Sequence, residues 1–177
     1  MKNLRTGKLN KLVYKLRWWK ARIVKLFSAR RYIKEYRKLL SDYGMNIAQD
    51  DYYIDPSAYF DNYDYSIITI GEGVTISREV LFLTHDFSVS KGLKLLNAGH
   101  GGYILHSIKI GNNCFVGARA ILLPGTRIGD NVIIGGGAVV KGTVPENSVV
   151  VGNPARVIGN TTEYGRKHFD AGDYIRT

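Results

Sequence analysis

A single cysteine, Cys114, is present among the 177 residues, which excludes an internal disulfide. The sequence also has no run of about 18 uncharged apolar residues, so we expect no transmembrane helix. Its first residues carry charges throughout their apolar part and have no small-residue cleavage site, which argues against a secretory signal. A chain of this length can bury one core but is too short for two full domains and a linker.

Several common catalytic signatures are missing as well. The sequence has no G-x-S-x-G, no G-x-x-x-x-G-K-[ST] and no complete G-x-G-x-x-G motif, so serine hydrolysis, P-loop chemistry and dinucleotide binding lack their usual signals. No compact spacing of His, Cys and carboxylate residues predicts a metal site. Cys114 occupies a repeat position that favours small interior residues, and we expect it to pack in the core.

Positive charge is concentrated at the N-terminus. The chain has a net charge of +10, but residues 1–38 hold 14 of its 25 Lys and Arg residues and one acidic residue, Glu35. Apolar residues there follow the 3-4 spacing of one helix face: Leu9, Leu12, Leu16, Trp19, Ile23 and Leu26. We therefore predict a basic amphipathic helical extension over residues 1–45.

Three interpretations of this extension remain open. A helix with an apolar stripe, tryptophan and a basic face suits peripheral binding to anionic lipid, at the inner face of a membrane. The same stripe suits packing against the rest of the chain or against matching helices in an oligomer. Nucleic-acid binding is the third interpretation, but no recognised motif supports it, and we expect no nucleic-acid partner.

A period of six residues dominates the second half of the sequence. Apolar residues recur at Ile110, Val116, Leu122, Ile128, Ile134 and Val140, and small or β-branched residues precede them by two positions. Neither a helix nor a flat strand has this period. The pattern predicts three short strands per triangular coil of 18 residues, with coils stacked at about 4.8 Å. Glycine follows several of the apolar residues, and we expect it to provide positive φ at the corners and a narrow interior.

The repeat extends backwards and is interrupted once. Ile70, Ile76 and Phe82 are in phase, and Ile54 and Phe60 are suitable for a first coil. No in-phase residue then occurs until Ile110, and the intervening residues 84–107 contain three of the four histidines. Long excursions from a compact repeat are usually functional.

Residues 108–159, which end in "VVVGNPARVIG", resemble the C-terminal signature of hexapeptide-repeat acyltransferases, above all the galactoside, maltose and other sugar or polysaccharide O-acetyltransferases. This resemblance implies a mainly β fold, a left-handed parallel β-helix over residues 46–159 with residues 84–107 inserted as a loop, and a tail over residues 160–177. It also implies a homotrimer with acetyl-coenzyme A bound in grooves between subunits.

The resemblance assigns the catalytic base to His85, because an alcohol attacks a thioester only as its proton is removed and histidine accepts protons at neutral pH. Asp86 is expected to orient His85 or to hold an acceptor hydroxyl, with Asp61 or Asp64 as the alternative carboxylate. The region of Asp61, Asn62 and Asp64 corresponds to acceptor-contacting residues. His100 and His106 are expected to be loop structure.

For acetyl-coenzyme A, family positions correspond to Ala118 and Gly136, and the Ala118 N–H suits an oxyanion donor. Arg156 of the "GNPAR" segment is expected to meet the phosphates of the coenzyme, followed by Lys141 and Arg119.

The function expected from the resemblance is acetyl transfer from acetyl-coenzyme A to a sugar hydroxyl, in a cytoplasmic enzyme that modifies bacterial surface polysaccharide or another glycan. N-acyl transfer to an amino sugar, serine O-acetylation and a non-catalytic binding scaffold remain alternatives. The sequence does not identify the acceptor.

Overall fold

The computed structural model describes Leu16, Trp19, Ile23 and residues 29–48, 53–61, 64–98 and 101–176. The chain divides into two compact units, Met1–Gly44 and Met45–Thr177. Most of the basic extension lies outside the described residues, so its three interpretations stay predictions. Within the first unit, helix α2 (Ala29–Asp42) buries one face, formed by Tyr32, Tyr36, Leu39 and Leu40. No helix in the described part of the chain is long and apolar enough to cross a membrane.

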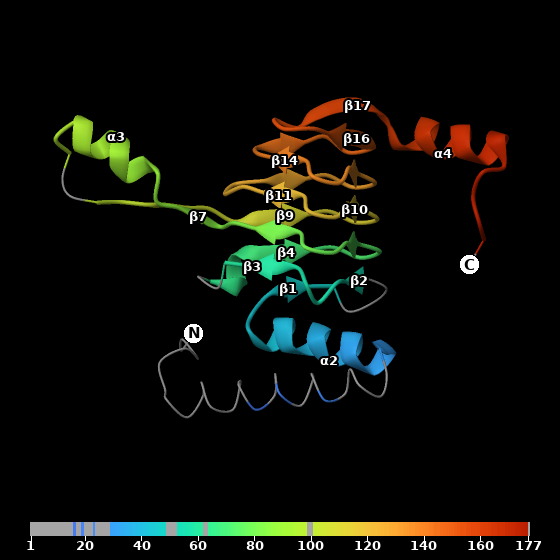
Figure 1. Cartoon of the computed structure of the whole chain (residues 1–177), viewed down its shortest axis with the longest axis horizontal. Helices are drawn as coiled ribbons and strands as arrows, with labels where there is room; N and C mark the ends of the chain where they lie inside the picture. Colours follow the sequence, from blue (N-terminus) through green and yellow to red (C-terminus); the bar gives the residue numbers. More distant parts are fainter. Residues whose placement is uncertain are drawn as a thin grey trace. The chain divides into compact units, whose positions relative to one another are not determined.

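The coil of the second unit is a stack of short strands arranged in three sheets, and a separate two-stranded sheet projects from it (Figure 1). The first sheet contains, in spatial order, β1 (Asn46–Ile47), β4 (Ile68–Ile70), β9 (Ile108–Ile110), β12 (Arg127–Ile128) and β15 (Thr143–Val144). The second contains β2 (Tyr53–Ile54), β5 (Thr75–Ile76), β10 (Phe115–Val116), β13 (Ile133–Ile134), β16 (Ser148–Val151) and β17 (Arg156–Asn160). The third contains β3 (Tyr59–Phe60), β6 (Leu81–Phe82), β11 (Ile121–Leu122) and β14 (Val139–Val140).

Strand pairing confirms the predicted repeat. Val116 pairs with Ile134 and Leu122 pairs with Val140, in each case in parallel and one 18-residue coil apart. The predicted apolar positions are all buried, and the positions two residues before them are buried as well, including Cys114, Ala120 and Thr126. The predicted parallel β-helix is therefore present, and its core is a column formed by the in-phase apolar residues and by the residues two positions before them.

The glycines of the repeat have a different role from the one expected. Gly111, Gly117, Gly129 and Gly135 are not among the residues with positive φ. Instead they lie where the backbones of successive coils meet: a Cβ on Gly117 would lie 2.5 Å from the Gly136 nitrogen. The expectation of positive φ at these glycines is therefore wrong, because what they provide is room for close backbone approach.

Positive φ occurs at other corner positions, and many of these are not glycine. Asn113, Asn131 and Asn147 have φ values of 51°, 57° and 57°. Asparagine tolerates this conformation better than most side chains. The Asn113 amide donates to Asn131 at 2.8 Å and the Asn131 amide donates to Asn147 at 3.0 Å, which forms a ladder across three coils. Hydrogen bonding between coils offsets the conformational cost at this corner.

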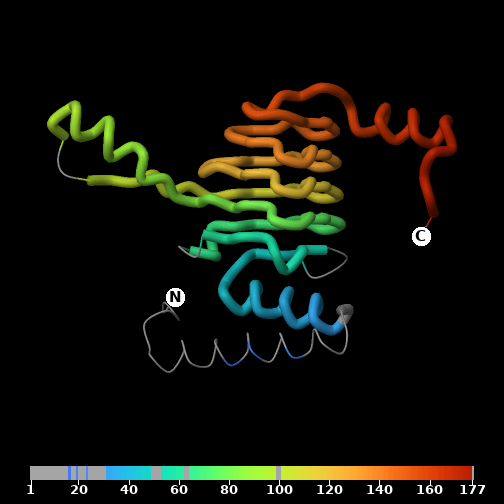
Figure 2. Tube along the Cα trace, in the orientation of Figure 1, coloured from blue at the N-terminus to red at the C-terminus, as the bar shows by residue number. Residues whose placement is uncertain are grey.

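The predicted loop over residues 84–107 is a structured arm. Strand β7 (His85–Asp86) pairs in antiparallel fashion with β8 (Ile104–Leu105), and α3 (Val89–Leu95) follows β7 (Figure 2). The His106 N–H donates to the Thr84 carbonyl at 2.9 Å, so both ends of the arm meet at one point of the coil. Coil registry continues across the insertion, because Ile76 pairs with Val116, 40 residues away.

The first and last coils depart from the regular repeat. The 3-10 helix η1 (Tyr65–Ile67) lies between β3 and β4, and β3 and β6 pair 22 residues apart. At the other end β17 pairs with β16 in antiparallel fashion, and helix α4 (Thr161–Ala171) follows. The side chain of Asn160 caps α4 by accepting from the Thr162 and Glu163 N–H groups, and Gly172 ends the helix with a φ of 65°.

We expect Gly117→Ala to destabilise the β-helix, because the added Cβ meets the backbone of the next coil rather than a side chain that can move. The expected loss is about 1–3 kcal/mol in the free energy of unfolding, measured by urea denaturation. Gly159→Ala is the matched control, since a Cβ there meets nothing within 4 Å. Equal stability of the two variants would contradict the close-approach role of Gly117.

Candidate active site

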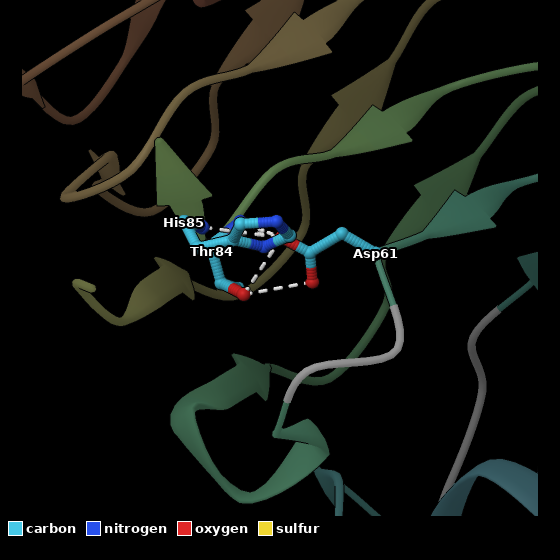
Figure 3. Close-up of polar contacts among 3 residues, drawn as sticks. All are labelled: Asp61, Thr84 and His85. Atoms are coloured by element: carbon cyan, nitrogen blue, oxygen red, sulfur yellow. Dashed lines mark hydrogen bonds and ion pairs between the residues drawn. The ribbon is translucent and has the colours of Figure 1, made fainter. Parts of the chain in front are cut away.

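A histidine and a buried carboxylate meet at the root of the arm (Figure 3). His85 Nδ1 lies 2.7 Å from Asp61 Oδ2, and the side chains are 24% and 4% exposed, respectively. The same carboxylate accepts from the Thr84 hydroxyl at 2.7 Å and from the backbone N–H of His85 at 3.1 Å. The Thr84 backbone N–H also donates to it, at 2.5 Å. Asp61 is thus held by several donors and cannot turn away from the imidazole.

This contact selects one form of the imidazole. A carboxylate only accepts hydrogen bonds, so a neutral His85 carries its proton on Nδ1. The lone pair then resides on Nε2, where it can take a proton from a hydroxyl group. A carboxylate behind the ring also stabilises the imidazolium that such a transfer creates. The pair is therefore arranged as a general base with a fixed tautomer.

Coil stacking explains why Asp61 and His85, which are 24 residues apart in the sequence, are in contact. Phe60 and Phe82 occupy equivalent positions of successive coils, and their rings stack with centroids 4.6 Å apart. Asp61 directly follows Phe60, and its N–H donates to the Phe82 carbonyl at 3.3 Å. Thr84 and His85 leave the coil just past Phe82, and Thr84 is fully buried. The corner that starts the arm is thus placed directly against Asp61.

The other acidic residues predicted for the site have different contacts. Asp86 accepts from the N–H and the hydroxyl of Ser88, at 2.7 and 2.9 Å. These bonds, with smaller contributions from the charges of Lys141 and His85, lower the pKa of Asp86. Asp64 caps η1 by accepting from the N–H and hydroxyl of Ser66. Asn62 lies outside the described residues. The carboxylate that contacts the His85 ring is Asp61, which the sequence analysis named only as the alternative to Asp86.

A groove of about 430 Å³ lies between the arm and two corners of the coil. Basic residues Arg127, Lys141 and His106 line it, together with Asp86. Its remaining walls are formed by Ile104, Ser107, Leu123, Pro124, Gly125 and Gly142. The mixture of an apolar wall and two lysine or arginine side chains suits an extended ligand that carries anionic groups. Lys141 was predicted from the sequence, whereas Arg127 was not.

The arm presents different residues on its two faces. Successive residues of a strand point to opposite sides, and His85 pairs with Leu105 while Asp86 pairs with Ile104. Asp86 and Ile104 line the groove, but His85 and Leu105 are not among the described residues that do so. The imidazole and the groove of one chain are therefore on opposite faces of the arm.

The remaining residues predicted to bind the coenzyme lie on the coils. Ala118 and Gly136 are neighbours on successive coils, since a Cβ on Gly136 would lie 3.1 Å from the Ala118 carbonyl oxygen. Arg156 is exposed on β17 and donates to its neighbouring Ala155 carbonyl. Arg119 is 77% exposed and forms an ion pair with Glu79 at 2.7 Å. These positions do not line the groove described above.

Cys114 is buried at its repeat position, as expected. Burial raises the pKa of the Cys114 thiol, which donates to the carbonyls of Asn112 and Gly129. Such a thiol is a poor nucleophile, which confirms that Cys114 packs in the core. The described part of the chain holds no group of three His, Cys, Asp or Glu side chains placed to bind a metal ion.

Two features of this site were not predicted from the sequence. Thr84 was not singled out, although its position before His85 and beside a buried corner makes it the natural partner of Asp61. Phe87 and Tyr103 were not singled out either; their rings lie 5.2 Å apart on the arm, and the Phe87 ring lies 5.3 Å from that of His85. The pairing of β7 with β8, which brings Phe87 and Tyr103 together, has no signal in the six-residue period.

Comparison with known proteins agrees with this geometry. Residues 107–142 match the family model for the bacterial transferase hexapeptide (six repeats). Galactoside O-acetyltransferase of Escherichia coli K12 is 35% identical over 111 residues, which cover 63% of this chain and 52% of the relative. The putative lipopolysaccharide biosynthesis O-acetyl transferase WbbJ of the same organism is 34% identical over 96 residues, which cover 51% of this chain and 49% of the relative.

Solved structures show the same fold. A maltose O-acetyltransferase from Clostridium difficile 630 superposes with a TM-score of 0.59 at 26% identity, over 87% of this chain and 89% of that one. A galactoside acetyltransferase in complex with coenzyme A gives 0.60 at 23% identity, over 94% and 88% of the two chains. The chain spans about half the length of the curated relatives named above. The repeats, the coil and these matches together show that the chain carries the hexapeptide repeat and is similar to hexapeptide-repeat acetyltransferases.

Proposed function

We propose that this protein is an O-acetyltransferase that moves an acetyl group from acetyl-coenzyme A to a sugar hydroxyl. The observation that carries the proposal is the Asp61–His85 pair at the root of the arm, with a 2.7 Å contact that leaves Nε2 as the base. The named relatives support the reaction type, because they are galactoside, maltose and lipopolysaccharide O-acetyltransferases. The similarity to WbbJ further supports an acceptor in bacterial surface glycan synthesis.

In the proposed reaction, His85 Nε2 removes the hydroxyl proton as the oxygen attacks the thioester carbonyl. The Asp61 carboxylate stabilises the imidazolium that results. When the carbon–sulfur bond breaks, the imidazolium returns the proton to the departing thiolate, so His85 ends as it began. A backbone N–H, for which we propose Ala118, stabilises the oxyanion between the two steps. No covalent acyl-enzyme is needed.

We further propose that the coil is left-handed, as in the family, and that the protein acts as a homotrimer. The two faces of the arm support the second proposal. His85 and the basic groove are on opposite faces of the arm in one chain, so a single chain does not bring its own base and its own groove together. A threefold arrangement, in which the groove of one subunit meets His85 of the next, provides a complete site.

The acceptor class is tested by offering purified protein acetyl-coenzyme A with a panel of acceptors. The panel contains the methyl pyranosides of galactose, glucose, mannose and N-acetylglucosamine, together with L-serine and glucosamine, and products are detected by mass spectrometry. We expect transfer to the hydroxyl of at least one pyranoside. Transfer only to serine or only to an amine would replace sugar O-acetylation with serine acetylation or N-acetylation.

The roles of the two candidate carboxylates are separated by matched variants. We expect His85→Ala and Asp61→Asn each to lower kcat by roughly 10²–10⁴-fold, because the first removes the base and the second no longer holds the proton on Nδ1. Asp86→Asn should lower kcat far less, because the Asp86 carboxylate accepts hydrogen bonds from Ser88 rather than from the His85 ring. A loss for Asp86→Asn equal to that for Asp61→Asn would restore Asp86 as the orienting residue. Circular dichroism checks that each variant is folded.

Arg156 is proposed to bind an anionic part of the donor from its exposed position on β17. We expect Arg156→Ala to raise the KM for acetyl-coenzyme A by about ten- to a hundredfold, the effect of losing one charge-assisted contact. The KM for the sugar should stay within about twofold of wild type. Equal increases in the two KM values would indicate a structural role for Arg156.

Subunit sharing of the site is tested by mixing two defective chains. His85→Ala removes the base, and Lys141→Glu reverses a charge in the groove. If each site uses His85 and Lys141 from different subunits, co-expressed mixtures should recover about a quarter of wild-type activity, because random assembly pairs two intact halves at that frequency. If each chain uses its own residues, the mixture stays as inactive as its components. Light scattering on the wild-type protein gives the subunit number.

A further inference from the structure

Two aromatic rings are exposed beside the candidate base. Phe87 is 56% exposed and Tyr103 is 43% exposed. Their ring centroids are 5.2 Å apart with a tilt of 45°, and the Phe87 ring stands nearly perpendicular to the His85 ring at 5.3 Å. The three rings form a continuous row that begins at the imidazole and joins the two chain segments of the arm. The fold of the chain leaves much of this row open to solvent.

The ring contacts place this row beside the imidazole. β7 ends at Asp86 and β8 begins at Ile104, so Phe87 directly follows one strand and Tyr103 directly precedes the other. The Phe87 ring lies 5.3 Å from the His85 ring and 5.2 Å from the Tyr103 ring, which joins the three side chains. Asp86 and Ile104, in contrast, line the basic groove. The aromatic row is thus separate from the groove and continuous with the base.

We propose that Phe87 and Tyr103 form the acceptor subsite and that a pyranose ring stacks on them by its apolar face. This inference rests on the proposed function and names how the sugar is held. The face of an aromatic ring carries partial negative charge and attracts the weakly positive C–H groups on one side of a sugar ring. Hydroxyl groups project from the rim of a stacked pyranose, so the rim hydroxyl nearest the imidazole meets the base.

The size and setting of the row favour a sugar over a protein partner. The two rings are together comparable in size to a single sugar ring, so they match a small ligand. The row also ends at the Asp61–His85 pair, and it includes a phenol hydroxyl at Tyr103, so polar groups border an apolar platform. This combination is typical of small-molecule sites that fix orientation with a few polar groups.

Stacking contributes equally to the ground state and the transition state, since the rings touch carbons that do not react. Losing it should therefore raise the KM for the sugar and leave kcat almost unchanged. We expect Phe87→Leu to raise the KM for methyl pyranosides by about three- to tenfold, the range for an aromatic contact. Phe87→Trp, which keeps a ring, should stay within twofold of wild type. Tyr103→Leu should act like Phe87→Leu.

The experiment uses the full chain with acetyl-coenzyme A and the pyranoside that gives most product in the acceptor panel. Leu95→Ala is the matched control, because Leu95 is an exposed apolar residue on the same arm but lies in α3, away from the ring row. The KM for acetyl-coenzyme A should not change in any of these variants. Saturation-transfer NMR with the same pyranoside should show ring C–H signals from one sugar face that disappear in Phe87→Leu.

The outcomes separate this inference from the proposed function. A wild-type protein that acetylates no pyranoside overturns both. A wild-type protein that does so, with Phe87→Leu unchanged in its KM for the sugar, overturns only the stacking subsite. A Phe87→Leu variant that changes its subunit number in light scattering would assign the ring to packing between copies, and it too would overturn the subsite. A raised KM for the sugar in Phe87→Leu, together with a KM close to the wild-type value in Phe87→Trp, supports the stacking subsite.

Discussion

The spacing between successive coils is the constraint on which the whole β-helix unit depends. Its strands are two to five residues long, too short to be stable as isolated pairs, so a ladder of parallel backbone hydrogen bonds must hold the stack together. Typical links are the Phe115 N–H to the Val132 carbonyl at 2.9 Å and the Thr75 N–H to the Cys114 carbonyl at 2.8 Å. Glycine is required where corner backbones meet at this spacing, and asparagine is favoured where one side-chain amide can reach its equivalent in the next coil.

The candidate site uses the same registry to bring distant residues together. Phe60 and Phe82 stack because they are equivalent positions of neighbouring coils, and Asp61 and Thr84 follow them. The carboxylate is thus carried by the coil rather than by the arm. The imidazole, in contrast, belongs to the first residue of β7. The candidate site therefore lies where the coil meets the arm, which gives the proposed base a buried partner and a partly exposed outer side.

The sequence predicted the column well because the six-residue period of apolar residues results directly from the stacking of equivalent strands. Each in-phase apolar residue is buried on a strand, and the excursion after Phe82 was visible as a break in the pattern. The contact between Asp61 and His85 was harder to predict, since it depends on a first coil of irregular length between Ile54 and Ile76. No periodic pattern in the sequence indicates the pairing of β7 with β8, so the row of Phe87 and Tyr103 could not be predicted from it. The role of the glycines that follow the apolar residues was predicted wrongly. The sequence alone does not distinguish a glycine that is needed for a positive φ from one that is needed because a side chain would not fit.

The hydrogen bond that closes the root of the arm determines which parts of the chain can change without disturbing the coils. Because the His106 N–H donates to the Thr84 carbonyl, the chain leaves and re-enters the column at a single point, and the 21 residues between those two positions do not set the registry of the coils. An arm of another length or composition can therefore be substituted there without moving the wall of small residues around Ala118 and Gly136. The acceptor subsite proposed on the arm and the donor contacts proposed on the coils are then structurally independent of each other.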